Sequence, residues 1–358
     1  MRVNENRLFV IVSPVYLLFT VLLADYFGIK NVLMAGCPCQ GFSERGYGHP
    51  CFYRTMNTMI EHIDFTPQQV AGVEQARRLF HGRGHAYPGL AHVSIDWLPP
   101  VALITLYEEA THEWLMAQAE WLMAKLSDCR SVQVQFRCRP MVPTEVLRGE
   151  PIDRLTVEVA GLAFQLQLGR TQNSGLFLDM SNGWQWLREQ TQNRRVLNLF
   201  SYTCAFSVAA IAGGAKHVVN VDISKAALSR GRDNHRLNHH DTGKVAFQGI
   251  DIFKSFSRLK KLGPYDLLVC DPPRFQKGSV DIKRDYKKII RRIPELVVSN
   301  GLVMLCLNAP DLDEAFLLDT VAQACPECRY VEQITPPAVF VEAQPGRGLK
   351  VLIFLYEG

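Results

Sequence analysis

The segment from Trp184 to the end of this 358-residue chain is a series of short apolar runs separated by stretches of helical periodicity. The runs are RRVLNLF, HVVNVDIS, KVAFQGI, YDLLVCDPP and GLVMLCLN. Strands that alternate with helices predict βαβ units, whose parallel strands are covered by helices on both faces. The pattern therefore predicts an α/β fold built on a buried parallel sheet.

A tight turn or an acidic residue stands at the end of each of the first four runs. The first run continues into NLFSYTCAF, Asn198 to Phe206, a turn that leads into a helix. Asp222, Asp251 and Asp271 stand at the ends of the next three runs. In open parallel sheets, ligands bind beyond the carboxyl ends of the strands, where the strand order reverses. We therefore expect these residues to form one binding site.

The residue types in this series indicate a nucleoside ligand. An acid at the end of the second strand, about twenty residues beyond the first turn, binds the ribose diol in nucleotide-binding sheets. Asp251 can accept a hydrogen bond from the exocyclic amine of adenine. The G-x-G-x-x-G fingerprint is absent, and a turn with Phe, Tyr and Cys leaves little room for a pyrophosphate. The predicted ligand is a nucleoside without phosphates, which S-adenosylmethionine matches.

These stretches resemble the class I S-adenosylmethionine-dependent methyltransferases that methylate bases of large-subunit ribosomal RNA. The resemblance rests on LFLDMSNGWQWL, VLNLFSYTCAFSVAA, VVNVDIS, GRDNHRLN and DPPRFQKG. It covers residues 150 to 358 and, more loosely, the preceding domain. It implies a Rossmann-like class I methyltransferase sheet with a smaller N-terminal α+β domain. Cys204 is a departure, because many relatives have glycine there.

The resemblance implies roles for residues at the matching positions. The turn after the first strand would contact the methionine part of the cofactor, Asp222 the ribose and Asp251 the adenine. QNSGLFLD, ending in Asp179, resembles a segment that covers the cofactor. The implied cofactor-binding residues are Asn198, Phe200, Ser201, Tyr202, Thr203, Asp222, Ile223, Ser224, Asp251, Ile252, Phe253 and Asp271.

The acid-Pro-Pro-aromatic segment implies the catalytic residues Asp271, Pro272, Pro273 and Phe275, and a later strand adds Asn308. The prolines fix their φ angles and stiffen the loop, so that a base edge meets a carboxylate held in one place. Phe275 would stack on a base turned out of its helix, and Arg274 and Lys277 would meet phosphates.

Two chemistries occur in the group, and the strand GLVMLCLNAPDL bears on the choice. Methylation at cytosine carbon five needs a cysteine nucleophile. Counting from Gly301, the catalytic position falls on Asn308, while Cys306 lies inside the apolar run. A buried thiol has a raised pKa and poor access. We therefore favour a purine ring nitrogen or an exocyclic position over cytosine carbon five.

The first half of the chain has a different pattern. Residues 59–175 predict a small α+β domain on the substrate side, and residues 176–358 the S-adenosylmethionine-binding domain. Residues 66–81 are predicted to form a helix with Thr66 as N-cap and Pro67 at its first position. HVSIDWLPPVALITLY predicts two strands, EATHEWLMAQAEWLMAKL a helix, and SVQVQFRCR and LTVEVAGLAFQLQL half-buried strands.

Residues 1–58 carry an apolar run, RLFVIVSPVYLLFTVLLADYFG, that leaves three interpretations open: an extension foreign to the folded protein, a buried helix, or an export or anchor signal. The ten cysteines are scattered, as is typical of a reduced cytoplasmic protein. Cys37, Cys39, Cys325 and Cys328 could form one zinc site, but the second half is not rich in histidine. We therefore expect no metal, and a membrane partner is not favoured.

Two basic stretches fit either an RNA partner or an ordinary surface. KRDYKKIIRRIPELV puts Arg284, Lys287, Lys288 and Arg291 on one helical face, with isoleucines opposite. RRLFHGRGHAYPGL carries arginines and histidines beside glycines. The net charge of +4 permits a nucleic-acid partner without requiring one. The sequence predicts methyl transfer to a base of RNA, most simply ribosomal RNA; the alternatives are a DNA, protein or small-molecule methyltransferase and a non-catalytic RNA-binding paralogue.

Overall fold

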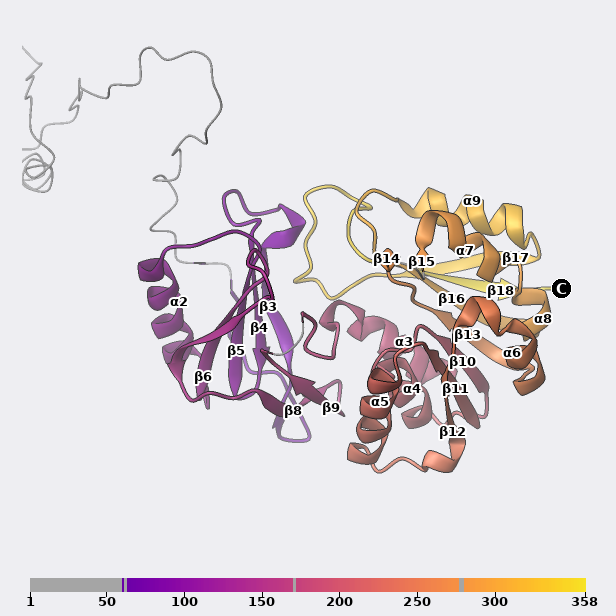
Figure 1. Ribbon diagram of the computed structural model, residues 1–358, viewed down its shortest axis with the longest axis horizontal. Helices are drawn as coiled ribbons and strands as arrows, with labels where there is room; N and C mark the ends of the chain where they lie inside the picture. The colour runs from indigo at the N-terminus through magenta and orange to yellow at the C-terminus, as the bar shows by residue number, and fades with distance from the viewer. Residues whose placement is uncertain (1–59, 61–62, 170–171, 277–279) are drawn as a thin grey trace, which may run out of the picture. The chain divides into compact units, whose positions relative to one another are not determined.

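The computed structural model describes residues 60, 63–169, 172–276 and 280–358, which fall within one compact unit, Thr55–Gly358. In its C-terminal part the described strands form a seven-stranded sheet of order β12-β11-β10-β13-β16-β18-β17 (Figure 1). The strands are β10 (Arg195–Leu199), β11 (His217–Asp222), β12 (Val245–Gly249), β13 (Tyr265–Cys270), β16 (Val297–Leu307), β17 (Cys328–Ile334) and β18 (Lys350–Tyr356).

The order of this sheet reverses beside β10. From β10 the chain moves outward through β11 to β12, then returns to β13 and continues to β16 on the other side, all in parallel. Strand β18 is antiparallel to both of its neighbours, β16 and β17. The pairing of Leu199 with both Val221 and Cys270 brings the carboxyl ends of three strands to one edge. The predicted parallel α/β sheet is confirmed, while β17 and β18 were not foreseen.

Both faces of the sheet are covered by helices, and alternate residues of each strand serve the two faces. Val196 of β10 belongs to one core cluster and Leu197 to another on the opposite side. The first cluster takes in α3 (Ser181–Gln190) and α4 (Ala205–Ala212), the second α6 (Phe256–Leu262), α7 (Ile282–Ile290), α8 (Ile293–Leu296) and α9 (Glu314–Ala324). Helix α5 (Lys225–Leu237) contacts α4, β11 and β12.

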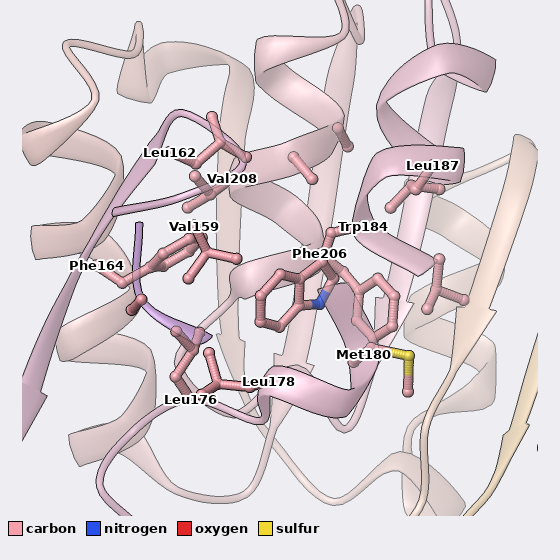
Figure 2. Packing of buried hydrophobic residues seen from close by; sticks show 14 of the residues in the cluster. Val159, Leu162, Phe164, Leu176, Leu178, Met180, Trp184, Leu187, Phe206 and Val208 are labelled. Atoms are coloured by element: carbon pink, nitrogen blue, oxygen red, sulfur yellow. The ribbon is translucent and has the colours of Figure 1, made fainter. Parts of the chain in front are cut away.

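The hairpin of β8 (Arg154–Val159) and β9 (Leu162–Gln167) completes the first cluster. Figure 2 shows Phe164 of β9 beside Trp184 of α3, with ring centroids 5.6 Å apart. The hairpin is thus packed in the same core as α3 and α4, although it precedes residue 175. The boundary at residue 175 remains a prediction.

A separate five-stranded sheet, of order β3-β4-β5-β6-β7, lies in the N-terminal part of the described chain. Its elements are β3 (Arg77–His81), β4 (Val93–Leu98), β5 (Val101–Leu106), α2 (His112–Lys125), β6 (Ser131–Phe136) and β7 (Thr144–Gly149). Strands β5 and β6 are parallel and joined through α2, and the other pairs are antiparallel. Helix α2 begins where Trp114 N donates to the Thr111 hydroxyl, and it buries Leu115 and Leu122. The strands and helix predicted here are confirmed, except that β6 is buried at every residue and not half-buried; β7 was missed.

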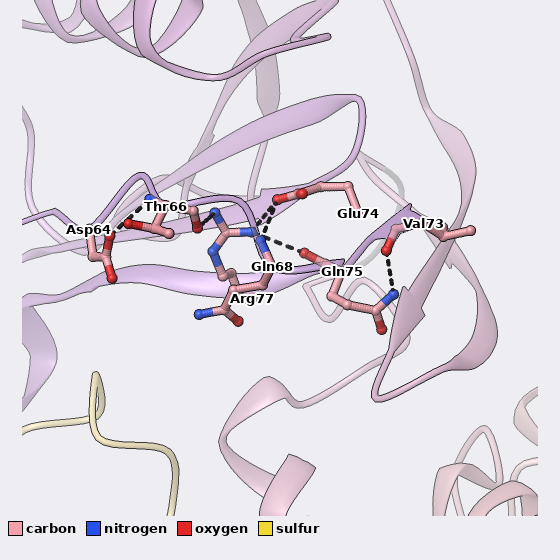
Figure 3. A network of polar contacts seen from close by, with 7 residues as sticks. All are labelled: Asp64, Thr66, Gln68, Val73, Glu74, Gln75 and Arg77. Carbon is pink, nitrogen blue, oxygen red and sulfur yellow. Dashed lines mark hydrogen bonds and ion pairs between the residues drawn. The ribbon is translucent and has the colours of Figure 1, made fainter. Parts of the chain in front are cut away.

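The helix predicted over residues 66–81 is wrong. The chain instead forms β1 (Gln69–Val70), β2 (Val73–Glu74) and then β3. Ala71 and Gly72 have φ of 49° and 82°, the backbone of a two-residue hairpin turn, which a continuous helix does not allow. Arg77 secures the segment by donating to the carbonyl oxygens of Thr66 and Gln75 at 3.0 and 3.3 Å (Figure 3). Thr66 is therefore not a helix cap.

The remaining predictions concern the apolar N-terminal segment, a zinc site and a membrane partner. The apolar segment of residues 1–58 lies outside the described residues, as do Cys37 and Cys39. Cys325 and Cys328 are buried with their sulfur atoms 3.5 Å apart. Within the described ranges, no helix is long and apolar enough to cross a membrane, and no group of three or more potential ligand side chains could hold a metal ion.

Candidate functional site

A cavity of about 480 Å³ lies at the carboxyl ends of β10, β11, β12 and β13. It therefore occupies the edge at which the strand order reverses, where parallel sheets bind their ligands. The predicted cofactor-binding and catalytic residues that line it are Phe200, Ser201, Tyr202, Thr203, Asp222, Ile223, Ser224, Asp251, Ile252, Phe253, Asp271, Pro272, Pro273 and Asn308.

The turn after β10 forms the floor of this cavity in an unusual backbone conformation. Phe200, Tyr202 and Cys204 have φ of 57°, 45° and 64°, in the left-handed region that favours glycine. Two side-chain bonds hold the turn: Asn234 Nδ2 donates to Thr203 O at 2.9 Å, and Thr203 Oγ1 donates to Gly175 O at 2.6 Å. Such conformations persist only where the surroundings impose them, and they concentrate at functional sites.

Cys204, the departure from the glycine of many relatives, fits this turn because of a glycine opposite. Its thiol is fully buried, and a Cβ atom added at Gly231 would lie only 2.3 Å from Cys204 Sγ. Burial raises the pKa of this thiol to about 12, so Cys204 is neutral and acts as a small packing group. The buried Ser201 hydroxyl beside it has this weakly bonding thiol as a polar neighbour and makes no other hydrogen bond within the described part of the chain.

Asp222 and Asp251 organise the loops that follow β11 and β12. The Asp222 carboxylate accepts hydrogen bonds from Tyr202 N and Ser224 N, both at 2.8 Å, which ties the first turn to the second strand. Asp251 accepts from Phe253 N at 2.9 Å. Each carboxylate oxygen has a second lone pair, so both acids can also accept hydrogen bonds from a ligand in the cavity.

Apolar groups flank these acids. The rings of Phe200 and Phe253 lie with their centroids 6.4 Å apart, and the buried Ile252 also lines the cavity. At the cavity mouth Ile223 and Phe177 are 51% and 44% exposed, unusual values for large apolar side chains. An apolar slot bounded by hydrogen-bond acceptors suits a flat heteroaromatic group with hydroxyl and amino substituents.

A second pair of acids lines the cavity: Asp271 from the segment after β13, and Asp179 from the short turn Leu178–Met180 before α3. Burial raises the pKa of the Asp271 carboxyl to about 7, and the charge of Asp179 contributes to this rise. Burial also raises the pKa of Asp179, against the opposing charge of Arg78. Perturbed carboxyl groups that face one another in a cavity are a frequent feature of functional sites. The predicted covering segment around Asp179 does line the cavity.

Asn308 follows β16 and is exposed, and its amide makes no hydrogen bond to the described residues. The loop that carries it is fixed by the buried Lys350, whose ammonium group donates to Ala309 O, Leu312 O and Gly346 O at 2.7 to 3.0 Å. Cys306 is fully buried inside β16, and burial raises its pKa well above the ordinary thiol value. The predicted burial of Cys306 is confirmed.

Two predicted residues lie outside the cavity lining. Asn198 is in the interior of β10, where its Nδ2 donates to Asn220 Oδ1 at 2.9 Å and links two strands. Asn198 was predicted to begin the turn, but it is the second-last residue of β10 and its side chain belongs to the sheet. Phe275 is 68% exposed in β14 (Phe275–Gln276), which pairs with β15 (Val280–Asp281).

The basic residues predicted to meet phosphates are partly engaged within the protein. Arg274 forms an ion pair with Asp311 at 3.0 Å, and Lys277 lies outside the described residues. On α7 the buried Asp285 accepts from Arg284 and pairs with Lys288 at 2.8 Å. The isoleucines on the opposite face of α7 are buried, as predicted.

Sequence reasoning missed several residues that line the cavity: Met180, Trp184, Ala205, Phe206, Ile250 and Leu349. Most lie before β10 or at the start of a helix. The rule that ligands bind just beyond the carboxyl ends of parallel strands, here called the strand-end rule, does not point to such positions. Leu349 comes from the segment before β18, a strand that was not predicted. The stretch LFLDMSNGWQWL, which carries part of the family resemblance, contains Met180 and Trp184 and was the signal that could have found them.

Comparison with protein families gives one extended match. The profile of a family described as S-adenosylmethionine-dependent methyltransferase matches residues 77–355. Ribosomal RNA large subunit methyltransferase I of Erwinia tasmaniensis is 35% identical over 201 residues, which are 54% of this chain and 51% of the relative. The protein of the same name from Cronobacter sakazakii is 30% identical over 275 residues, 73% of this chain and 69% of the relative. The chain thus spans about half the length of the first relative.

Solved structures give the same picture of the fold. A methyltransferase-like protein crystallised in complex with SAH has a TM-score of 0.71 at 25% identity, over 78% of this chain and 75% of its own. A protein from Streptococcus mutans described as SAM-dependent has a TM-score of 0.70 at 25% identity, with the same shares covered. The predicted Rossmann-like sheet with an additional N-terminal domain is confirmed as the fold class.

Proposed function

Because this chain belongs to the family of S-adenosylmethionine-dependent methyltransferases, we propose that it transfers the methyl group of S-adenosylmethionine to a base of RNA. The observation that supports this most is that one cavity contains three features. Asp222 can accept hydrogen bonds from a ribose, Asp251 can accept one from an adenine, and the Asp271-Pro-Pro segment lies in the same lining. The relatives named ribosomal RNA large subunit methyltransferase I favour ribosomal RNA as the substrate.

The residues of the cavity fit the cofactor part by part. Asp222 would accept from the ribose hydroxyls, and Asp251 from the adenine amine, with Phe253 and Ile252 against the ring. The Ser201 hydroxyl, whose hydrogen-bonding neighbour among the described residues is the weak Cys204 thiol, would bond the polar end of the methionine part. Buried hydroxyl groups are normally hydrogen-bonded, so the buried Ser201 hydroxyl favours a polar ligand group next to it.

The catalytic demand on the protein is modest. The sulfonium of the bound cofactor supplies a methyl group that is already activated. The protein has to align the attacking atom of the base with the methyl carbon and exclude water. Asp271, on its proline-stiffened segment, and Asn308 would orient the base edge from two sides. For an exocyclic amine, the ionised carboxylate of Asp271 or Asp179 would accept the proton that the nitrogen loses.

The base atom is proposed from the contrast between Asn308 and Cys306. Attack through cytosine carbon six needs an accessible thiolate, and Cys306 is buried with a raised pKa. Asn308 offers an amide that can donate to and accept from a base edge without a covalent step. We therefore favour a purine ring nitrogen or an exocyclic position over cytosine carbon five.

The direct test is transfer of radiolabelled methyl groups into total RNA from a strain that lacks the gene. We expect label in ribosomal RNA with the wild-type protein and with Asp319→Asn, a control that alters an exposed acid on α9. We expect little label with Asp271→Asn. Label in DNA, in protein or nowhere with the wild type would contradict the proposal and favour one of the alternative functions.

RNA that contains 5-fluorocytidine tests the base position separately. A carbon-five enzyme is trapped on such RNA as a covalent adduct that survives denaturation. We expect no adduct. An adduct that disappears in Cys306→Ala would overturn the choice of atom while leaving methyl transfer to RNA intact.

A further inference from the structure

A second cavity, of about 540 Å³, adjoins the first along the side away from β11 and β12. The two cavities share Asp179, Asn308, Phe177, Asn173, Leu176 and Leu349 in their linings. The second cavity is bounded on its other side by residues of the five-stranded sheet, among them Ser94, Tyr107 and Arg137. A group held there would thus have a direct path to Asp179 and Asn308.

The strand directions of the five-stranded sheet explain why cations gather at this place. Strand β4 is antiparallel to both β3 and β5, and β6 is parallel to β5, so β3, β5 and β6 end at the same edge. Arg83, Tyr107 and Arg137 each follow one of these three strands. Arg137 N donates to Leu106 O at 2.7 Å, which places Arg137 beside Tyr107.

The three side chains form a stack of two cations and one ring, which we call the Arg83–Tyr107–Arg137 stack. The guanidinium carbon of Arg83 lies 4.0 Å from the centre of the Tyr107 ring, and that of Arg137 lies 5.6 Å from it. Stacking on an aromatic ring leaves the in-plane N–H groups of a guanidinium available for an anion. The ring therefore orders two cations without neutralising them.

Arg83 and Arg137 differ from the nearby Arg78 in that Arg78 is paired with a carboxylate. Arg78 donates to Asp96, at 3.4 Å for its Nη2, and is thereby compensated. Within the described ranges, neither Arg83 nor Arg137 has a carboxylate within ion-pair distance. Arg137 instead donates hydrogen bonds to uncharged oxygens of Gln135, Gln172 and Asn173. Burial raises the pKa of the Glu342 carboxyl above its ordinary value, although the positive charge of Arg83 opposes this rise.

A further unpaired group points into the same cavity from β4. Ser94 is 2% exposed, lines the second cavity, and its hydroxyl has no hydrogen-bond partner in the described residues. Buried hydroxyl groups are almost always bonded, so this one indicates a polar ligand atom at that depth. The cavity thus offers uncompensated cations near its edge and a free hydroxyl inside, next to the Asp179 and Asn308 of the first cavity.

We propose that the second cavity binds the substrate nucleotide of an RNA strand, with its phosphate against Arg83 and Arg137 and its base between Asp179 and Asn308. The proposal rests on the proposed function and deepens it by assigning the substrate to a site. A volume of 540 Å³ is in the range of pockets that enclose small ligands, which a single nucleotide resembles in size. Recognition of one extruded nucleotide is also the common way to reach an atom of a paired base.

The test measures binding first, so that it does not depend on catalysis. A fluorescent single-stranded RNA is titrated with wild type, Arg83→Ala, Arg137→Ala and the control Arg258→Ala, which removes an exposed arginine of α6 outside both cavities. We expect each cavity variant to bind at least about tenfold more weakly than the control. Each lost phosphate contact should also reduce the slope of log affinity against log salt by about 0.7.

Two further measurements separate a phosphate contact from a structural role. Arg83→Lys and Arg137→Lys keep the charge, and we expect them to restore the salt slope while recovering only part of the affinity. Binding of S-adenosylmethionine, measured by calorimetry, should stay within about twofold of wild type in every variant. Loss of cofactor binding together with RNA binding would show a folding defect and contradict the assignment.

The outcomes distinguish this inference from the proposed function. If wild type methylates RNA but the cavity variants bind and react like Arg258→Ala, the nucleotide site is wrong and the function stands. If wild type transfers no methyl group to RNA, but nucleoside 5′-monophosphates compete for RNA binding and this competition is lost in Arg137→Ala, the site stands without the function. Equal RNA affinity and equal salt slope in all variants would overturn the site in either case.

Discussion

The seven-stranded sheet and the five-stranded sheet each carry polar side chains where strands of one direction end, but the side chains differ in kind. The larger sheet ends in carboxylates, Asp222, Asp251 and Asp271, beside a turn with left-handed residues. The smaller one ends in the Arg83–Tyr107–Arg137 stack. Acceptors suit the hydroxyl and amino groups of a nucleoside, whereas uncompensated cations suit a phosphate.

In both sheets the edge where the strands end determines the location of the site, and the loop residues determine its chemistry. Parallel strands bring their carboxyl ends together in both sheets, whichever residues the loops then carry. The proposed division of labour is that the larger sheet binds the cofactor and the smaller sheet the substrate. Asp179 and Asn308 line both cavities and would be the point at which the two ligands meet.

The largest effect is expected at Asp271, which lines the first cavity and whose pKa is raised in part by the charge of Asp179, a residue of both cavities. Asp271→Ala should lower kcat by about a hundredfold or more, because the base edge loses an orienting and proton-accepting group. The affinity for S-adenosylmethionine should change by less than about threefold, as measured by calorimetry. Equal losses in turnover and cofactor affinity would show that Asp271 only binds the cofactor. Asp271 would then have no role toward the substrate.

Asp222 should show the opposite profile. Asp222→Ala should weaken S-adenosylmethionine binding by about 2 to 3 kcal/mol, because a charged acceptor for the ribose hydroxyls is lost. RNA affinity should stay near wild type. Asp222→Asn is the milder variant: Tyr202 N and Ser224 N donate to different oxygens of Asp222, and the amide keeps one oxygen, so it retains one of these acceptors while losing the charge. Calorimetry that gives wild-type cofactor affinity for both variants would remove Asp222 from the site.

The strand-end rule explains which parts of the site could be predicted. Asp222, Asp251 and Asp271 stand directly at the ends of apolar runs, so their positions followed from the sequence. The prediction that Asn198 binds the cofactor is not matched by the cavity lining. Asn198 lies one residue before the end of β10, so its side chain is inside the sheet and donates to Asn220 on the neighbouring strand. The same rule applies to Tyr107 and Arg137, yet it requires knowing that β5 and β6 are parallel, which depends on the crossover through α2.

Other failures have local causes. The false helix over residues 66–81 arose because apolar spacing and a plausible cap outweighed one Ala71–Gly72 turn. The hairpin of β8 and β9 alternated like a half-buried strand pair, but no pattern in it revealed that it would pack against Trp184. Packing between elements distant in sequence is decided by the whole core, and periodicity describes only one element at a time.

The raised pKa of Asp271 predicts a pH-dependent difference in stability. The folded protein keeps a proton on this carboxyl up to about pH 7, while the unfolded chain loses it near the ordinary aspartate value. The wild type should therefore lose stability as pH rises between these values, relative to Asp271→Asn, which has no charge to bury. We expect the variant to gain about 2 kcal/mol on the wild type between about pH 4.5 and pH 8, measured by urea unfolding. Parallel stability curves would contradict the enclosed state of this carboxyl.

The smallest effect is expected on α7, whose basic face was the other candidate for RNA contact. Asp285 already engages Arg284 and Lys288 on that face, and Lys287 donates to Gln323 Oε1 at 3.1 Å. Arg291 is exposed, so it is the residue of this face best placed to reveal a contact with RNA.

Arg291→Ala removes one positive charge, as Arg83→Ala does, but from outside both cavities. Loss of a distant surface charge should weaken binding of single-stranded RNA by less than about threefold, and only at low salt, where screening is weak. Titration at two salt concentrations separates this from a phosphate contact, which also changes the salt slope. A loss of affinity as large as that of Arg83→Ala, with the same reduction in slope, would move the RNA path to α7 and end the proposed division between the two sheets.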